Sequence, residues 1–118
     1  MTFRPRRGMV LDLDLDPVQG SETGKTRPCV VVTTDTYHAR VPVIQVTPIT
    51  AWSEKKVRIV TNVLLHPSVQ NGLAKQSVAD CLQTRPVDYV RRYVRTRGEL
   101  APGDMAAIDA ALRIVFSL

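Results

Sequence analysis

An alternation of side chains runs through Met9-Val10-Leu11-Asp12-Leu13-Asp14-Leu15-Asp16. Met9 and the three leucines fall on one side of an extended chain, and Val10 and the three aspartates fall on the other. This period of two predicts a half-buried β-strand with the aspartates on a solvated face. Pro17 ends the strand, and the polar stretch 18–26, which has two glycines and no apolar periodicity, predicts a mobile surface loop.

Beyond this loop, β-branched runs at 28–34 and 41–49 indicate two central strands, and we expect further strands at 56–63 and 77–84. The segment 86–97 is ambiguous between a short helix and a strand. Apolar residues then fall at helical spacing, at Met105, Ile108, Leu112 and Val115. Pro102 suits the first turn of that helix, and Asp104 complements the positive end of its dipole.

About five strands followed by a helix, in 118 residues, predict a single domain over residues 1–118. The expected class is mainly β with a C-terminal helix (α+β): a small, strongly bent antiparallel sheet or barrel against which the helix packs. Such a sheet leaves its loops at one rim, where functional residues are expected.

Charge and composition limit the classes of partner that the protein is expected to bind. The net charge of +5 and the pI of about 9.7 suit nucleic acid or an acidic protein segment, and charge alone does not choose between them. No run approaches the roughly 18 apolar residues of a membrane-spanning helix, and residues 1–8 lack the apolar run of a signal peptide, so we expect a cytoplasmic protein without a membrane partner. Cys29 and Cys81 sit in apolar runs without CxxC spacing and are interpreted as core thiols.

Three motifs carry a family resemblance. The first comprises Arg7-Gly8-Met9-Val10, Asp16-Pro17-Val18-Gln19-Gly20-Ser21-Glu22, and Arg27-Pro28 before an apolar strand. It resembles the N-terminal signature of the MazF/PemK toxin ribonucleases, which is a strand opened by Gly, a D-P-x-x-G-S-E loop, and R-P before a strand. Val46-Thr47-Pro48-Ile49-Thr50 and the segment 77–85 are similar to two later strands of that family. The resemblance covers nearly the whole chain and weakens through 35–40 and after Pro86.

The resemblance implies an SH3-like barrel of the MazF/PemK/CcdB type and a toxin of a type II toxin–antitoxin system. It implies sequence-specific cleavage of single-stranded RNA (mRNA), which inhibits translation and growth. The ribose 2′-OH attacks the adjacent phosphorus, leaving a 2′,3′-cyclic phosphate and a 5′-OH. It further implies a homodimer, to which the C-terminal helix contributes, and a cognate antitoxin whose acidic tail occupies the RNA grooves. No H-E-x-x-H, paired-Asp or CxxC motif appears, so no metal or cofactor is expected.

The catalytic residues that the resemblance implies are Arg27, Thr50 and Glu22. A guanidinium offers five donors in a planar fork to the charge that develops on the phosphorane, and Pro28 biases Arg27 towards an extended backbone. Thr50 would donate its hydroxyl to a phosphate oxygen. A guanidinium stays protonated and is a poor proton acceptor, so residue chemistry names no general base. The resemblance implies acid–base work by Arg27, with Glu22 positioning it or contacting a base edge.

Substrate binding is expected in the 18–26 loop, after Thr50 and at the end of the later strand. Trp52 could stack on an unpaired base or fill a core or dimer gap, and lysines could track phosphates. The position before Gln83 is often acidic in relatives and is Leu82 here, so the sequence preference for cleavage is not carried over. The expected substrate-binding residues are Gly20, Ser21, Thr23, Lys25, Pro28, Trp52, Lys56 and Gln83.

Three alternatives stay open. His38 and His66 would make a natural acid–base pair, but both fall in turn-like segments and match no family motif, which favours exposed loop residues. A CcdB-like gyrase-poisoning toxin would share the fold, although the R-P and P-I-T motifs argue against it by resemblance. A non-catalytic RNA-binding module is separated from a nuclease only by an assay.

Overall fold

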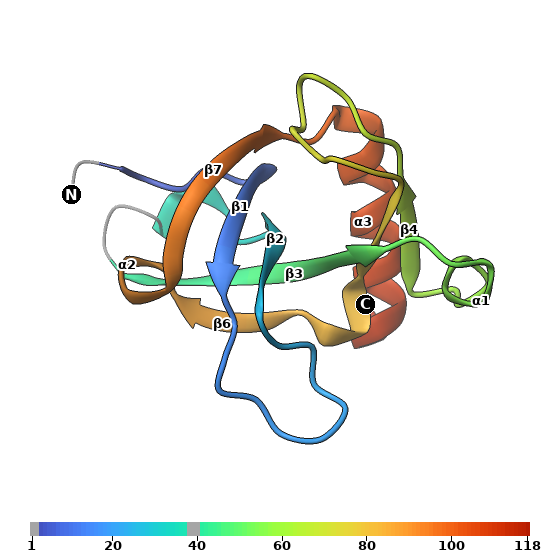
Figure 1. The fold of residues 1–118 in the computed structure, drawn as a ribbon, viewed down its shortest axis with the longest axis horizontal. Helices are drawn as coiled ribbons and strands as arrows, with labels where there is room; N and C mark the ends of the chain where they lie inside the picture. The colour runs from blue at the N-terminus through green and yellow to red at the C-terminus, as the bar shows by residue number, and fades with distance from the viewer. Residues whose placement is uncertain (1–2, 38–40) are drawn as a thin grey trace.

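The computed structural model describes residues 3–37 and 41–118, which form one strongly bent antiparallel sheet flanked by a helix (Figure 1). The strand order is β4-β5-β3-β2-β1-β7, and β6 pairs with β3 beside β5. The strands are β1 (Met9–Asp14), β2 (Thr26–Val31), β3 (Val43–Ala51), β4 (Asn62–Leu65), β5 (Ser77–Asp80), β6 (Arg85–Asp88) and β7 (Tyr93–Glu99). Within the described ranges no pairing joins β4 to β7, so the bent sheet is confirmed and it is not closed into a barrel.

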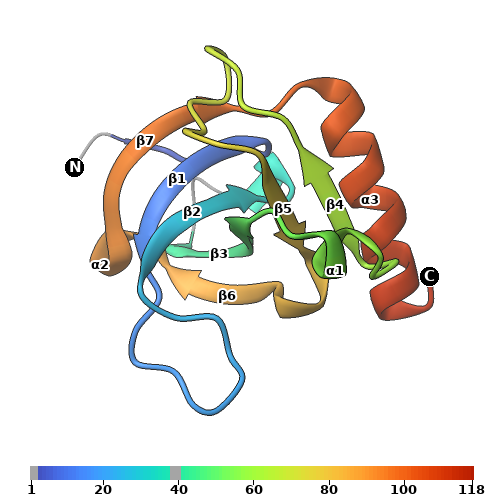
Figure 2. The same ribbon diagram turned by 45° about the vertical axis from the view of Figure 1, so that its right-hand side comes forward.

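The predicted C-terminal helix is α3 (Pro102–Phe116), with Pro102 and Asp104 in its first turn. It packs along β4 at one side of the sheet (Figure 2) and buries Met105, Ile108 and Ala111. The remaining helical elements are single turns: η1 (Asp35–Tyr37), α1 (Glu54–Val57), η2 (Cys81–Gln83) and α2 (Tyr89–Arg92). No helix in the described part of the chain is long and apolar enough to cross a membrane.

Two sequence interpretations need correction. The strand expected at 56–63 begins only at Asn62, because Ser53 caps a helical turn there by accepting a hydrogen bond from the Lys56 backbone N–H at 3.1 Å. The ambiguous segment 86–97 contains both structures, since Asp88 caps the turn α2 between β6 and β7. The sheet therefore has seven strands rather than about five.

The solvated-face interpretation is wrong for Asp12. β1 lies between β2 and β7 in the sheet, with Asp12 opposite Arg95, and Asp12 is only 6% exposed. β7 supplies the counter-charges, because the Nε atoms of Arg95 and Arg97 each donate to the Asp12 carboxylate at 2.6 Å. Asp14 and Asp16, further along, are exposed.

The core lies on both faces of the sheet. One cluster packs under α3 and includes Val10, Ile49 and Ile108, and the other fills the inside of the bend. Cys29 and Cys81 belong to these clusters as free, fully buried thiols, which confirms the interpretation as core residues. Burial raises the pKa of each thiol to about 12, so neither is a thiolate nucleophile near neutral pH.

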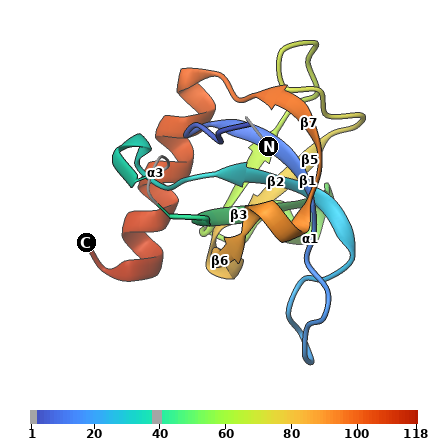
Figure 3. The same ribbon diagram turned by 90° about the vertical axis from the view of Figure 1, so that its left-hand side faces the viewer.

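The register of β2 against β3 places the two main motif residues together. Cys29 pairs with Pro48 in this antiparallel ladder. Continuing the register two residues beyond that pair places Arg27 opposite Thr50. The R-P and P-I-T motifs, which lie far apart in sequence, are therefore neighbouring strand ends at one rim. The 18–25 loop projects from the same rim, away from the body of the sheet (Figure 3).

Candidate active site

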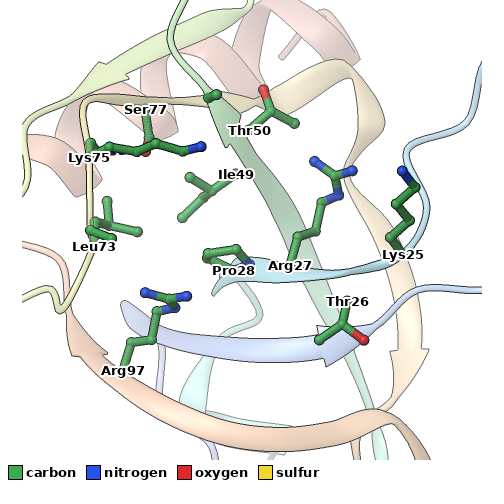
Figure 4. A pocket seen from close by; sticks show the side chains of 12 residues that line it. Lys25, Thr26, Arg27, Pro28, Ile49, Thr50, Leu73, Lys75, Ser77 and Arg97 are labelled. Atoms are coloured by element: carbon green, nitrogen blue, oxygen red, sulfur yellow. Dashed lines mark hydrogen bonds between the residues drawn. The ribbon is translucent and has the colours of Figure 1, made fainter.

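A cleft of about 410 Å³ opens where β2, β3, β7 and the segment before β5 meet (Figure 4). We call it the cationic cleft. Its lining combines the cations Lys25, Arg27, Lys75 and Arg97 with Thr26, Thr50, Ser77, Pro28, Ile49, Ala51, Leu73 and Ala74. Among these described lining residues there are four cations and no carboxylate. Apolar residues surrounded by positive charges and hydroxyl groups suit the binding of a polyanionic strand.

Arg27 is half-buried and directed by the loop that precedes it. Its Nε donates to the Gly24 carbonyl at 2.6 Å, and neither Nη atom has a hydrogen bond to a described residue. A Cβ at Gly24 would lie 2.5 Å from Asp16 Oδ1, so a side chain there would have to displace that carboxylate. The loop thus occupies one edge of the guanidinium and leaves the other edge facing the cleft (Figure 4).

Thr50 lies on the same cleft, so the structure brings it together with Arg27. Its Oγ1 accepts a hydrogen bond from Lys56 Nζ at 3.3 Å, and the same ammonium donates to the Ala51 carbonyl at 3.1 Å. Since Lys56 is donor only, the hydroxyl proton of Thr50 is left for another acceptor. The Lys56 ammonium also acts on Asp80. Burial raises the pKa of Asp80 above its ordinary value, and backbone N–H donors and Lys56 offset part of that rise.

Glu22 and Gln83 lie in a second cleft of about 350 Å³, lined by Glu22, Leu82, Gln83, Thr84, Arg85 and Pro86. We call this the loop cleft. Glu22 Oε1 accepts from the Gln19 backbone N–H at 2.9 Å. The structure therefore does not bring Glu22 together with Arg27 and Thr50 in one cleft.

The amide of Gln83 is engaged with the 18–25 loop. Its Oε1 accepts from the Thr23 backbone N–H at 3.2 Å, and its Nε2 donates to the Ser21 carbonyl at 3.1 Å. At its base the loop is closed by Asp16 Oδ1, which accepts from the Lys25 N–H at 3.0 Å. The loop is a surface loop, as predicted, and it is also tied to the body at two points.

The other expected residues are spread around the rim. Lys25 and Pro28 line the cationic cleft, whereas Gly20 lies in the exposed part of the loop with a φ of +53°. Trp52 is 43% exposed just after β3 and lines neither cleft. His66 is exposed, as the sequence favoured, and His38 lies outside the described residues.

Sequence reasoning missed two lining cations, Lys75 and Arg97. Arg97 is one of five arginines between residues 85 and 97, but the strand pairing that directs it into the cleft is not local in sequence. Lys75 carries no motif signal. Within residues 3–37 and 41–118, no three His, Cys, Asp or Glu side chains gather in a group able to hold a metal ion.

Comparison with known proteins places this chain in a family. The chain is 30% identical over 118 residues to "Endoribonuclease MazF9" of Mycobacterium tuberculosis, with 96% of this chain and 97% of that protein covered. It shares its fold with a crystal structure of MazF from Deinococcus radiodurans, at a TM-score of 0.83 and 22% identity, covering 98% of this chain and 99% of that one. A mycobacterial endoribonuclease solved with its cognate antitoxin superposes with a TM-score of 0.76, at 21% identity and with 97% and 96% covered.

The match to a family model spans almost the entire chain, residues 6–116. It includes the R-P motif, the P-I-T motif and α3, so the resemblance noted in the sequence is confirmed. The chain belongs to the family of PemK-like, MazF-like toxins of type II toxin–antitoxin systems.

Proposed function

We propose that this chain is an endoribonuclease toxin that cleaves single-stranded RNA in the cationic cleft. The observation that carries the proposal is the convergence of Arg27 and Thr50 on one cleft with four cations and, among its described lining residues, no carboxylate. Family membership and the name of the 30% identical relative support the same activity.

The chemistry is transesterification within the RNA. The ribose 2′-oxygen forms a bond to the adjacent phosphorus as the bond to the 5′-oxygen breaks, which yields a 2′,3′-cyclic phosphate and a 5′-OH. The attacking oxygen loses a proton and the leaving oxygen gains one. The pentacoordinate phosphorus between these steps carries extra negative charge, and fixed donors directed at that charge lower the barrier.

Arg27 and Thr50 supply those donors. The free Nη edge of Arg27 can form paired N–H···O bonds to the non-bridging phosphate oxygens. Lys56 donates to Thr50 Oγ1, so the threonine proton is directed to a further phosphate oxygen or to the leaving group. Lys25, which lines the cleft, and Lys56, which donates to Thr50, add positive charge near the RNA strand, and Pro28 forms part of the apolar lining.

Base recognition belongs to the loop cleft and its rim. Glu22 is a carboxylate that can accept from the exocyclic amino group of a base, while Gln83, Ser21 and Thr23 hold the loop in place. Gly20 allows the turn at the outer part of this loop. Trp52 is exposed enough to stack on an unpaired base.

The expected protein partner would bind at the same cationic cleft. An acidic antitoxin segment would compete with RNA for the cationic cleft, because both present negative charge to the same four side chains. We expect a homodimer in the cytoplasm, and we expect no metal or other cofactor.

The decisive experiment incubates the purified protein with single-stranded RNA in EDTA and sequences the cut ends. We expect cleavage at a short preferred sequence, with cyclic phosphate and 5′-OH termini. The matched control is the same RNA with one 2′-deoxyribose at the mapped cut site, which should remain intact because the nucleophile is missing. Cleavage of the deoxy substrate, or activity only with added metal, would refute the mechanism.

A further inference from the structure

A second guanidinium points into the cationic cleft from β7 (Figure 4). Arg97 has a side chain that is only 18% exposed. Its Nε donates to Asp12 Oδ1 at 2.6 Å, and its Nη1 donates to the Gly72 carbonyl at 3.0 Å. Its Nη2 has no hydrogen bond within the described part of the chain. Two of its three nitrogens are therefore fixed by the protein, and the third remains for a ligand.

The anchor of this guanidinium is a buried carboxylate that it shares with one neighbour. Asp12 accepts from the Nε atoms of both Arg95 and Arg97, so the three charges sum to +1. The two arginines differ in position: Arg95 has a side chain that is 61% exposed and does not line the cleft, whereas Arg97 does. The ion pair with Asp12 holds Arg97 in place, and the group of Asp12, Arg95 and Arg97 keeps a net positive charge.

The adjoining wall of the cleft is built by close backbone contact. A Cβ on Gly72 would lie 2.3 Å from the Arg97 carbonyl oxygen, and a Cβ on Gly98 would lie 2.1 Å from the Gln70 carbonyl oxygen. The two glycines let the segment before β5 lie directly against β7. This contact places Lys75 on the same side of the cleft as Arg97 (Figure 4).

We infer that Arg97, assisted by Lys75, forms a second phosphate site for the RNA strand whose scissile phosphate lies at Arg27 and Thr50. The inference rests on the proposed function. Pro28 and Ile49 lie between the two guanidinium groups (Figure 4). An RNA strand has the same alternation, with negative phosphates separated by sugars and bases that have apolar faces. Asp12 is the positioning residue of this second site.

The test compares Arg97→Ala with Arg95→Ala. Both variants lose one positive charge and one hydrogen bond to Asp12, but only the first removes a group from the cleft. Binding is measured at several salt concentrations on a single-stranded RNA that contains the mapped cut site with one 2′-deoxyribose. We expect Arg97→Ala to weaken binding by about 10- to 100-fold and to reduce the slope of log K against log salt by about 0.7. Arg95→Ala should change affinity by less than about threefold.

Cleavage of the all-ribose RNA provides a second readout. Arg97→Ala should raise KM and leave kcat within about threefold, because the group does not contact the reacting phosphorus. Arg97→Gln, which retains a donor for Asp12, guards against a folding defect and should reproduce the loss while unfolding at a temperature close to the wild type. If the wild-type protein cleaves RNA and the Arg95 and Arg97 variants have equal effects, this inference alone is overturned. A wild type that does not cleave would overturn the proposed function instead.

Discussion

The cationic cleft and the loop cleft both contain residues of the family motifs, but their polar groups are used differently. In the loop cleft, the Gln83 amide is hydrogen-bonded at both ends, and Thr84 donates to the Cys81 carbonyl at 2.8 Å. In the cationic cleft, the Nη edge of Arg27 and the Thr50 proton have no protein acceptor among the described residues. Groups already satisfied by the protein maintain its shape, and groups left unsatisfied at a surface are those that can act on a substrate.

The largest effect should come from comparing one arginine in each cleft. We expect Arg27→Ala to lower kcat by roughly 100- to 1000-fold, because the phosphorane would lose its paired donors. Arg85→Ala should lower kcat by less than about tenfold, since Arg85 lines the loop cleft and not the cationic cleft that holds Arg27 and Thr50. Single-turnover cleavage of the mapped RNA measures both. Equal losses would mean that the two clefts do not differ in chemistry.

The second comparison concerns stability. Asp12→Ala leaves Arg95 and Arg97 without their shared carboxylate, and we expect the free energy of unfolding to fall by about 1–3 kcal/mol. Asp14→Ala, on the exposed end of the same strand, should cost less than about 1 kcal/mol. Urea unfolding followed by circular dichroism gives both values. A tolerated Asp12→Ala would show that the buried carboxylate does not organise β1 and β7.

The third prediction tests how Thr50 is oriented. Lys56→Met removes the donor to Thr50 Oγ1, and we expect kcat to fall about tenfold with little change in KM. Lys55→Met is the matched control, because Lys55 lies on the same helical turn and is exposed, but it does not donate to Thr50. A rise in KM without a change in kcat would instead make Lys56 a simple phosphate contact.

The smallest effect should be on the loop. Gln83→Ala removes both hydrogen bonds to the 18–25 loop, which we expect to destabilise the protein by about 1 kcal/mol and to leave kcat within about threefold. The cut-site map should broaden, since base selection depends on a fixed loop. Hydrogen exchange offers a direct check: the Thr23 amide, whose acceptor is Gln83 Oε1, should exchange faster. Leu82→Ala, at a 67% exposed neighbour, should leave that rate unchanged.

Much of the fold follows from local pattern. The alternation in residues 9–16 predicts β1, and the helical spacing from Met105 onward predicts α3. Local pattern fails where a short-range cap overrides propensity, as Ser53 does at α1, and where strand pairing decides burial, as β7 does for Asp12. A period of two shows which residues share a face, but it does not show which side chains from neighbouring strands pack on that face.

The candidate site divides in the same way. Arg27 and Thr50 were identified through the family resemblance, and their proximity follows from the β2–β3 register, which no residue pattern in either segment encodes. Lys75 and Arg97 became visible only in three dimensions, because two glycines bring their segments into contact. Long-range packing, rather than motif chemistry, completes the cleft.

The buried thiol of Cys29, two residues from Arg27, also determines how this strand reacts with oxidants. Burial raises the pKa of this thiol to about 12, so it is protonated at pH 7, whereas hydrogen peroxide and alkylating agents react with the thiolate form. The strand that carries Arg27 therefore presents no reactive thiol while the protein is folded.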